Sequence, residues 1–121
     1  MAFHPNPFDG MGDLGIDYSL IHSLFGTEVV TIPSAQIAIS LASVKEEEII
    51  TENERDKQLY KISDDLDDEI LNESNRLYLA ISKILRDREI MGYTMNYQDF
   101  LSFPGIMTHP FWALSKLQSE E

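Results

Sequence analysis

Apolar and polar positions recur with helical spacing over one long stretch of the chain, residues 59–91. Placed at about 100° per residue, they separate into an apolar face and a polar face. The apolar face comprises Leu59, Ile62, Leu66, Ile70, Leu77, Ala80, Ile81, Ile84 and Met91, and the opposite face comprises Asp64, Asp68, Asn75, Ser82 and Arg86. A row spaced by sevens (Leu71, Tyr78, Leu85) widens the apolar side, which predicts contacts with two neighbouring elements. The pattern predicts a long central amphipathic helix over about residues 63–91.

The start of this helix has two interpretations. Thr51-Glu52-Asn53-Glu54 has the spacing of a capping box, which places a helix start at residue 51. Ser63-Asp64-Asp65 offers a second start. A single helix from residue 51 would be about 60 Å long, more than a compact domain of this size needs, and would indicate an oligomer or a larger assembly. Two helices that meet near Ser63 are therefore the favoured interpretation.

Shorter elements flank the central helix. Asp17 is a good N-cap for a helix over residues 17–25, and Gly26 stands where a C-terminal glycine belongs. Asn96 caps a further short helix, and Thr108 a last helix with Pro110 in its first turn. These elements predict an all-α fold, with residues 17–121 as a single helical domain.

Residues 28–43 leave the fold class open. Ser34 can cap a helix that runs to about Glu48, with Ile37 and Leu41 facing inward. The same stretch also alternates apolar and small polar residues, which is typical of a β-hairpin and would make the fold α+β. The helix is the favoured interpretation.

Residues 1–16 contain prolines and glycines at positions that exclude a helix or a regular strand. We expect an extended arm, held open by Pro5 and Pro7. The arm carries Phe3, Phe8 and Met11, more apolar side chains than a solvated tail needs, so it should cross a surface, either of a partner or of its own domain.

The net charge of −12 changes the functional picture. It disfavours direct binding of nucleic acid, which needs clustered Lys and Arg, and of an anionic membrane surface. Without cysteine the chain has no thiol nucleophile and no thiolate metal ligand. No secretory signal is recognisable, and the longest uncharged run, residues 29–44, is too short and too polar to span a bilayer. A cytoplasmic protein is expected, or a virion protein if the source is viral.

Sequence motifs for catalysis are absent: there is no helix-borne di-metal signature, no nucleophile elbow, no zinc-protease motif and no phosphate-binding glycine loop. No catalytic, cofactor-binding or metal-binding residue is assigned, and no cofactor is expected. One enzymatic alternative follows from Glu46, Glu47 and Glu48, which precede an acidic helix. This arrangement resembles all-α nucleotide pyrophosphohydrolases, and the resemblance implies that Asp64, Asp68 and Glu46 or Glu47 converge on magnesium.

A second alternative uses the distribution of charge. Residues 45–75 hold twelve acids and four bases, whereas residues 76–88 hold four bases and one acid. The acidic block suggests an inhibitor that imitates nucleic acid and binds a basic cleft of another protein. Four bases interrupt the block, which makes this interpretation weaker than a general binding role.

Two regions favour contact with partner proteins besides the arm. Glu73 lies near the middle of the apolar stripe, where a carboxylate must find a partner or solvent. The last third of the chain is rich in aromatic residues, which are enriched at interface centres. The full set of interface candidates is Phe3, Phe8, Met11, Glu73, Arg88, Tyr97, Phe100, Phe103, Phe111 and Trp112.

The leading interpretation is a small, acidic, helical subunit or adaptor without enzymatic activity. We expect it to bind protein partners, within a larger complex or as a homo-oligomer. A viral or phage assembly component would suit this size and composition.

Overall fold

A computed structural model of the chain describes residues 2–3, 17–97 and 105–119. The described elements are β1 (Ala2–Phe3), α1 (Tyr18–Phe25), β2 (Val30–Thr31), α2 (Ser34–Ser43), α3 (Glu46–Leu59), α4 (Asp68–Asp87) and α6 (Phe111–Ser119). The predicted helical class is confirmed. The predicted short helix after Asn96 falls largely on residues 98–104, outside the described residues.

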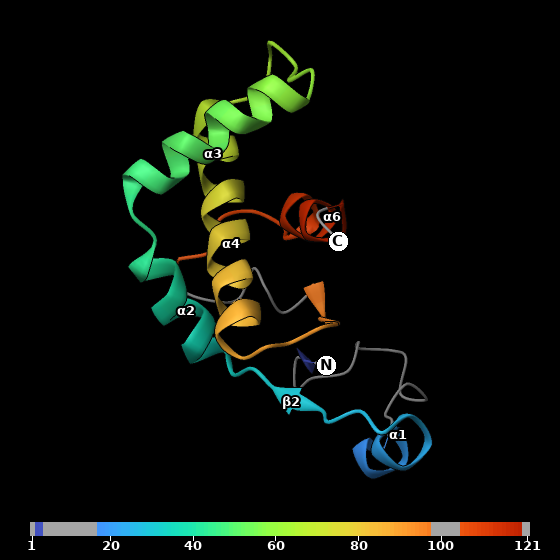
Figure 1. Ribbon diagram of the computed structural model, residues 1–121. Coiled ribbons are helices and arrows are strands. Elements are labelled where there is room, and N and C mark those ends of the chain that lie inside the picture. The colour runs from blue at the N-terminus through green and yellow to red at the C-terminus, as the bar shows by residue number, and fades with distance from the viewer. Residues whose placement is uncertain (1, 4–16, 98–104, 120–121) are drawn as a thin grey trace.

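Helix α4 forms the centre of the molecule, with α2, α3 and α6 packed around it (Figure 1). One apolar cluster joins α4 to α2, α6 and the segment before α2. Its buried members are Ile32, Ile37, Leu41, Leu77, Tyr78, Ala80, Ile81, Ile84 and Ala113. Within this cluster the Ser40 hydroxyl donates to the Ala80 carbonyl at 2.9 Å, so the buried hydroxyl of α2 is satisfied by the backbone of α4.

The sequence left open whether residues 51–91 form one helix or two. The structure has two, α3 and α4, separated by the turn 60–67. The Asp67 carboxylate caps α4 by accepting from the Glu69 N–H at 2.8 Å. The predicted start at residue 63 is therefore five residues early. The predicted capping box at Thr51 is wrong, because the Thr51 hydroxyl donates to the Glu47 carbonyl inside α3.

The start of α3 lies at Glu46. The Glu48 carboxylate accepts from the Lys45 N–H at 2.8 Å, which satisfies one of the backbone donors at the helix start. Three glutamates occupy the first turn, where the helix dipole favours negative charge.

Helix α4 ends before residue 91, the predicted end of the central helix. Glu89 takes a left-handed conformation with φ 53°, and the Ile90 N–H donates to the Leu85 carbonyl at 2.8 Å. The Glu89 N–H donates to the Arg86 carbonyl, which completes a Schellman motif without glycine. Helix α4 thus ends at Asp87, and Met91 lies outside it with 94% of its surface exposed.

The predicted polar face of α4 is only partly correct. Asp68 and Arg86 are exposed as expected, but Asn75 is fully buried and Ser82 is buried too. Ile70, predicted on the apolar face, is 50% exposed. The reason is that three described helices pack against α4 rather than two, so its middle is covered on both faces, whereas Ile70 lies in its first turn.

Residues 34–43 form helix α2, and the β-hairpin alternative is wrong. Helical spacing turns Ile37 and Leu41 toward the core and leaves Ile39 72% exposed. A hairpin would place these three side chains on the same face. Ser34 is the first helical residue rather than the cap, and the helix ends at Ser43 instead of Glu48.

The first strand of the chain pairs with the segment before α2. β1 lies parallel to β2, with Ala2 opposite Val30 and Phe3 opposite Thr31. The beginning of the predicted arm therefore lies along its own domain. Helix α1 has the predicted caps: the Asp17 carboxylate accepts from the Ser19 N–H, and Gly26 takes φ 63° and donates to the His22 carbonyl.

Helix α6 begins directly after Pro110, whose carbonyl accepts from the Leu114 N–H at 2.9 Å. The predicted cap at Thr108, with Pro110 in the first turn, is therefore wrong: Pro110 lies just before the helix, where its missing N–H costs no hydrogen bond. Two residues of the helix are buried, Ala113 and Lys116.

Candidate functional site

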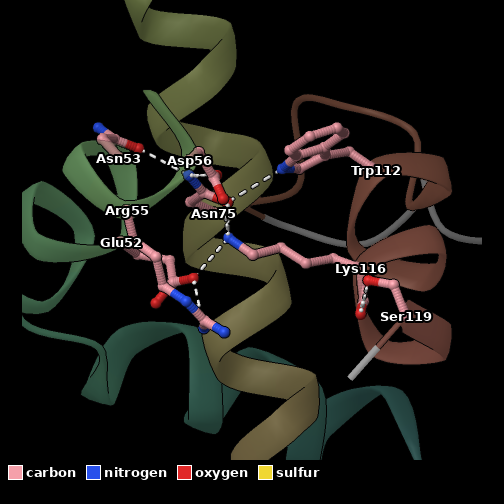
Figure 2. A network of polar contacts seen from close by, with 8 residues as sticks. All are labelled: Glu52, Asn53, Arg55, Asp56, Asn75, Trp112, Lys116 and Ser119. Carbon is pink, nitrogen blue, oxygen red and sulfur yellow. Dashed lines mark hydrogen bonds and ion pairs between the residues drawn. The ribbon is translucent and has the colours of Figure 1, made fainter. Parts of the chain in front are cut away.

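The junction of α3, α4 and α6 holds a cluster of buried and half-buried polar side chains that the sequence did not predict (Figure 2). We call it the polar junction, and it comprises Glu52, Asn53 and Asp56 of α3, Asn75 of α4, and Trp112 and Lys116 of α6. Asp56 and Asn75 have no exposed surface, and Lys116 is 4% exposed. Such groups are found inside proteins only when they are paired.

Lys116 is the cation of the polar junction. Its Nζ lies 2.6 Å from Asp56 Oδ1 and 2.6 Å from Glu52 Oε1, and donates to Asn75 Oδ1 at 3.2 Å. All three ammonium donors therefore have an acceptor. The Nζ also lies 4.4 Å from the centroid of the Tyr78 ring, within the range of a cation–π contact.

Asn75 joins the three helices through both ends of its amide. Its Nδ2 donates to Asn53 Oδ1 and to Asp56 Oδ2, each at 2.7 Å. Its Oδ1 accepts from Trp112 Nε1 at 3.1 Å as well as from Lys116. This accounts for both donors and both lone pairs of the amide, and it fixes the orientation of the side chain.

The polar junction is closed by contacts among its own side chains. Lys116 directs its donors at oxygens of Glu52, Asp56 and Asn75. The Arg55 side chain, which is 48% exposed, lies 3.2 Å from the Glu52 carboxylate. Two cations, Lys116 and Arg55, therefore pair with two carboxylates. The junction attaches α6 to the helix pair and so sets the position of the aromatic residues at the start of α6.

Phe111, the first residue of α6, forms a partly exposed cluster with His109 and Tyr97. The Phe111 ring is stacked on His109 at a centroid distance of 5.4 Å, and Tyr97 meets Phe111 at 5.2 Å. Phe111 is 53% exposed and the neighbouring Met107 is 73% exposed. Aromatic and Met side chains in such positions are typical of interface centres.

Helix α1 presents a second apolar surface. Leu20, Leu24 and Phe25 are 51%, 66% and 74% exposed, and of its large apolar side chains only Ile21 is buried. No other described helix or strand packs against α1, which lies apart from the α2–α3–α4–α6 group in Figure 1. We call the exposed residues Tyr18, Leu20, Leu24 and Phe25 the α1 face.

The predicted interface candidates are dispersed in the structure. Glu73 is partly buried, with its Oε1 3.4 Å from Arg76 Nε on the same helix, and Arg76 also reaches Glu46 of α3 at 3.6 Å. Arg88 is exposed and donates to Gln36 at 2.7 Å. Trp112 belongs to the polar junction. Phe3 pairs through its backbone in β1, and four candidates lie outside the described residues: Phe8, Met11, Phe100 and Phe103.

The carboxylates of the hydrolase alternative do not converge. Glu46, Glu47, Asp64 and Asp68 are all exposed, and within the described ranges no group of three His, Asp or Glu residues is arranged to hold a metal ion. The magnesium site implied by that resemblance is therefore not formed by these residues.

Two exposed carboxylates have altered acidity. The pKa of Asp17 is lowered, chiefly because the Ser19 hydroxyl donates to it at 2.7 Å, with the Ser19 N–H as a second donor. The pKa of Asp65 is lowered mainly by the hydrogen bond from the Ser63 hydroxyl. Both groups stabilise local turns and stand apart from the polar junction.

Comparison with protein-family models and with curated proteins gives no match for this chain. Among the helices that the structure describes, none has the length and apolar character to cross a membrane. The functional argument therefore depends on the surfaces themselves.

Neither the polar junction nor the α1 face was identified from sequence. Lys116 lies on α6, and its partner Asp56 lies 60 residues earlier in the chain. The only local signal was Trp112, one turn before Lys116 on the same side of α6. For α1, the exposure of the apolar residues follows from the absence of a covering element among the described residues.

Proposed function

We propose that this protein is a non-enzymatic interaction subunit that binds another protein surface through the α1 face. The observation that carries the proposal is the exposure of Leu20, Leu24 and Phe25 on a helix against which no other described element packs. Large apolar side chains gathered on one surface element mark interaction sites.

The length of α1 supports this role. Isolated helices shorter than about 12–15 residues are marginal in water, and α1 has eight residues. Its caps stabilise the ends, but most helical stability in proteins comes from packing of the apolar face. A partner that covers Leu24 and Phe25 would supply that packing, and each buried side chain would contribute about 1.5–3 kcal/mol.

The test compares two exposed apolar residues. Leu24→Glu changes the α1 face, and Ile39→Glu changes an equally exposed residue on α2, 72% exposed against 66%. Each variant and the parent protein serve as bait in an extract of the native host, and size-exclusion chromatography with light scattering measures their oligomeric state. We expect both variants to retain the parent's circular dichroism, since neither side chain is buried.

The proposal expects a protein partner, or a second copy of the chain, that is bound by the parent and by Ile39→Glu and lost with Leu24→Glu. A charge on the α1 face would weaken such a contact by more than about tenfold. A monomeric parent that retains no partner, or equal binding by both variants, would contradict it.

A further inference from the structure

The turn between α3 and α4 forms an open hollow of about 460 Å³. Its apolar lining comes from Tyr60, Ile62 and Leu66, of which Tyr60 is 41% and Leu66 39% exposed. Two further apolar side chains flank it in the sequence, Leu59 at 60% and Ile70 at 50% exposure. The other five lining residues are polar or charged: Lys57, Lys61, Ser63, Asp64 and Asp68. The hollow thus combines exposed apolar side chains with charged groups on one open surface, and exposed apolar side chains that gather in one place mark interaction sites.

Local contacts hold the walls of the hollow in place. The Tyr60 ring meets the Trp112 ring edge-on at a centroid distance of 5.4 Å, which connects the hollow to the polar junction. The Leu66 N–H donates to the Ser63 carbonyl at 3.1 Å. Lys57 and Asp68, at the ends of the two helices, approach to 3.9 Å. A preformed site loses less entropy when a ligand binds.

Charge around the hollow selects the ligand. Two bases, Lys57 and Lys61, and two acids, Asp64 and Asp68, line the hollow itself. The turn adds three further acids and no further base, Asp65, Asp67 and Glu69, so residues 57–70 carry a net negative charge. All seven side chains are exposed, and the whole chain carries a net charge of −12. Long-range attraction therefore favours a positively charged ligand.

From these observations we infer that the hollow binds a basic amphipathic segment of a partner protein. The apolar residues of the segment enter between Tyr60, Ile62 and Leu66, and its Lys and Arg residues face the acids of the turn. A second copy of this chain is disfavoured by like charge, and an anionic lipid surface by the same acids. An amphipathic helix in an apolar groove is a common mode of recognition.

The inference rests on the proposed function, because it names a partner class for a second surface of the same interaction subunit. The turn between α3 and α4, which lines the hollow, and helix α1 lie at opposite ends of the molecule in Figure 1. Two separate binding surfaces are the arrangement of an adaptor that joins two partners.

The probe is a fluorescently labelled peptide of about four helical turns, with leucines along one face and lysines along the other. One comparison peptide has glutamates in place of the lysines, and another has the same composition in scrambled order. Fluorescence polarisation with the full chain measures binding. We expect the basic amphipathic peptide to bind at least about tenfold more tightly than either comparison peptide.

Two variants locate the binding. Leu66→Ser removes an apolar wall of the hollow, and Ile39→Ser removes an exposed apolar residue of α2. We expect Leu66→Ser to weaken binding about tenfold and Ile39→Ser to leave it unchanged. If both bind like the parent, the peptide is held by general electrostatic attraction and the inference is overturned.

Salt and peptide charge distinguish the other outcomes. Added NaCl should weaken binding without abolishing it, because apolar contacts are not screened. Binding that vanishes with salt and ignores Leu66→Ser would indicate a broad acidic face that imitates nucleic acid, and preference for the glutamate peptide would indicate an anion site at Lys57 and Lys61. Either result overturns the inference.

The α1 variant separates this inference from the proposed function. Leu24→Glu should bind the basic peptide like the parent protein. If the parent forms an α1-dependent complex but does not bind the basic peptide, only the inference about the hollow is contradicted. If the parent binds the peptide but forms no α1-dependent complex, only the function proposed for α1 is contradicted.

Discussion

The two sides of α4 are packed in different ways. Toward α2, Leu77, Ile81 and Ile84 share an apolar cluster with Ile37 and Leu41. Toward α3 and α6, the fully buried Asn75 is surrounded by the charged groups of the polar junction. A single helix of 20 residues thus combines a mainly apolar interface with one that contains buried charged groups.

The difference concerns how each interface specifies its geometry. Apolar side chains need only fill space, so related sizes are tolerated at moderate cost. The polar junction depends on each partner, because a charge or amide that loses its partner stays buried and unpaired. We therefore expect the polar side to determine where α6 docks and the apolar side to supply much of the stability.

The largest expected effect comes from the cation of the polar junction. Lys116→Met keeps much of the side-chain volume but leaves the Asp56 and Glu52 carboxylates facing each other without their shared ammonium group. We expect the free energy of unfolding to fall by about 3–5 kcal/mol, measured as a lower urea midpoint followed by circular dichroism.

Lys57→Met is the matched control, because this lysine is 56% exposed by its side chain and its ion pair with Asp68 lies at the surface. Its effect should stay within about 0.5 kcal/mol. Combining Lys116→Met with Asp56→Leu should cost less than the sum of the two single changes. Strict additivity of the two changes would show that the polar junction is not a coupled unit.

On the apolar side, Leu41→Ala removes a side chain that is 7% exposed and belongs to the cluster with Leu77 and Ile81. The expected loss is about 2–5 kcal/mol, because transfer and cavity contributions add. Leu41→Met keeps a side chain of similar volume and should cost less than about 1.5 kcal/mol, whereas Lys116→Met is expected to be costly although it also keeps much of the volume. The same urea titration measures both, with Ile39→Ala as the exposed control.

The smallest effect is expected in α1, which has neither kind of interface with a described helix. The lowered pKa of Asp17 means that its carboxylate favours the folded helix start at pH above the usual aspartate value near 3.9, and that this contribution disappears as the pH falls through the lowered pKa. NMR chemical shifts of Ser19 and its neighbours should report fraying in acid.

Asp17→Asn is the control for that titration, since asparagine also caps helices but does not ionise there. Its α1 shifts should lack the acid step seen in the parent. If the variant shows the same step, another group controls the start of α1.

The sequence by itself determined the helical class and several local boundaries. Asp17 and Gly26 delimit α1 through hydrogen bonds to residues two to four positions away, and helical spacing in residues 34–43 turns Ile37 and Leu41 to one side. These features depend on residues that are close in the chain, so a local sequence pattern is enough to predict them. The turn between α3 and α4 was anticipated near Ser63 for the same reason.

The tertiary structure alone decided which polar residues are buried. Periodicity placed Asn75 on the solvent face of α4, because it compares a residue only with others on its own helix. That face is covered by Asp56 and Lys116, which come from helices 19 residues before and 41 residues after Asn75. Each of these side chains alone resembles a surface residue, and only their mutual hydrogen bonds offset the cost of removing them from water.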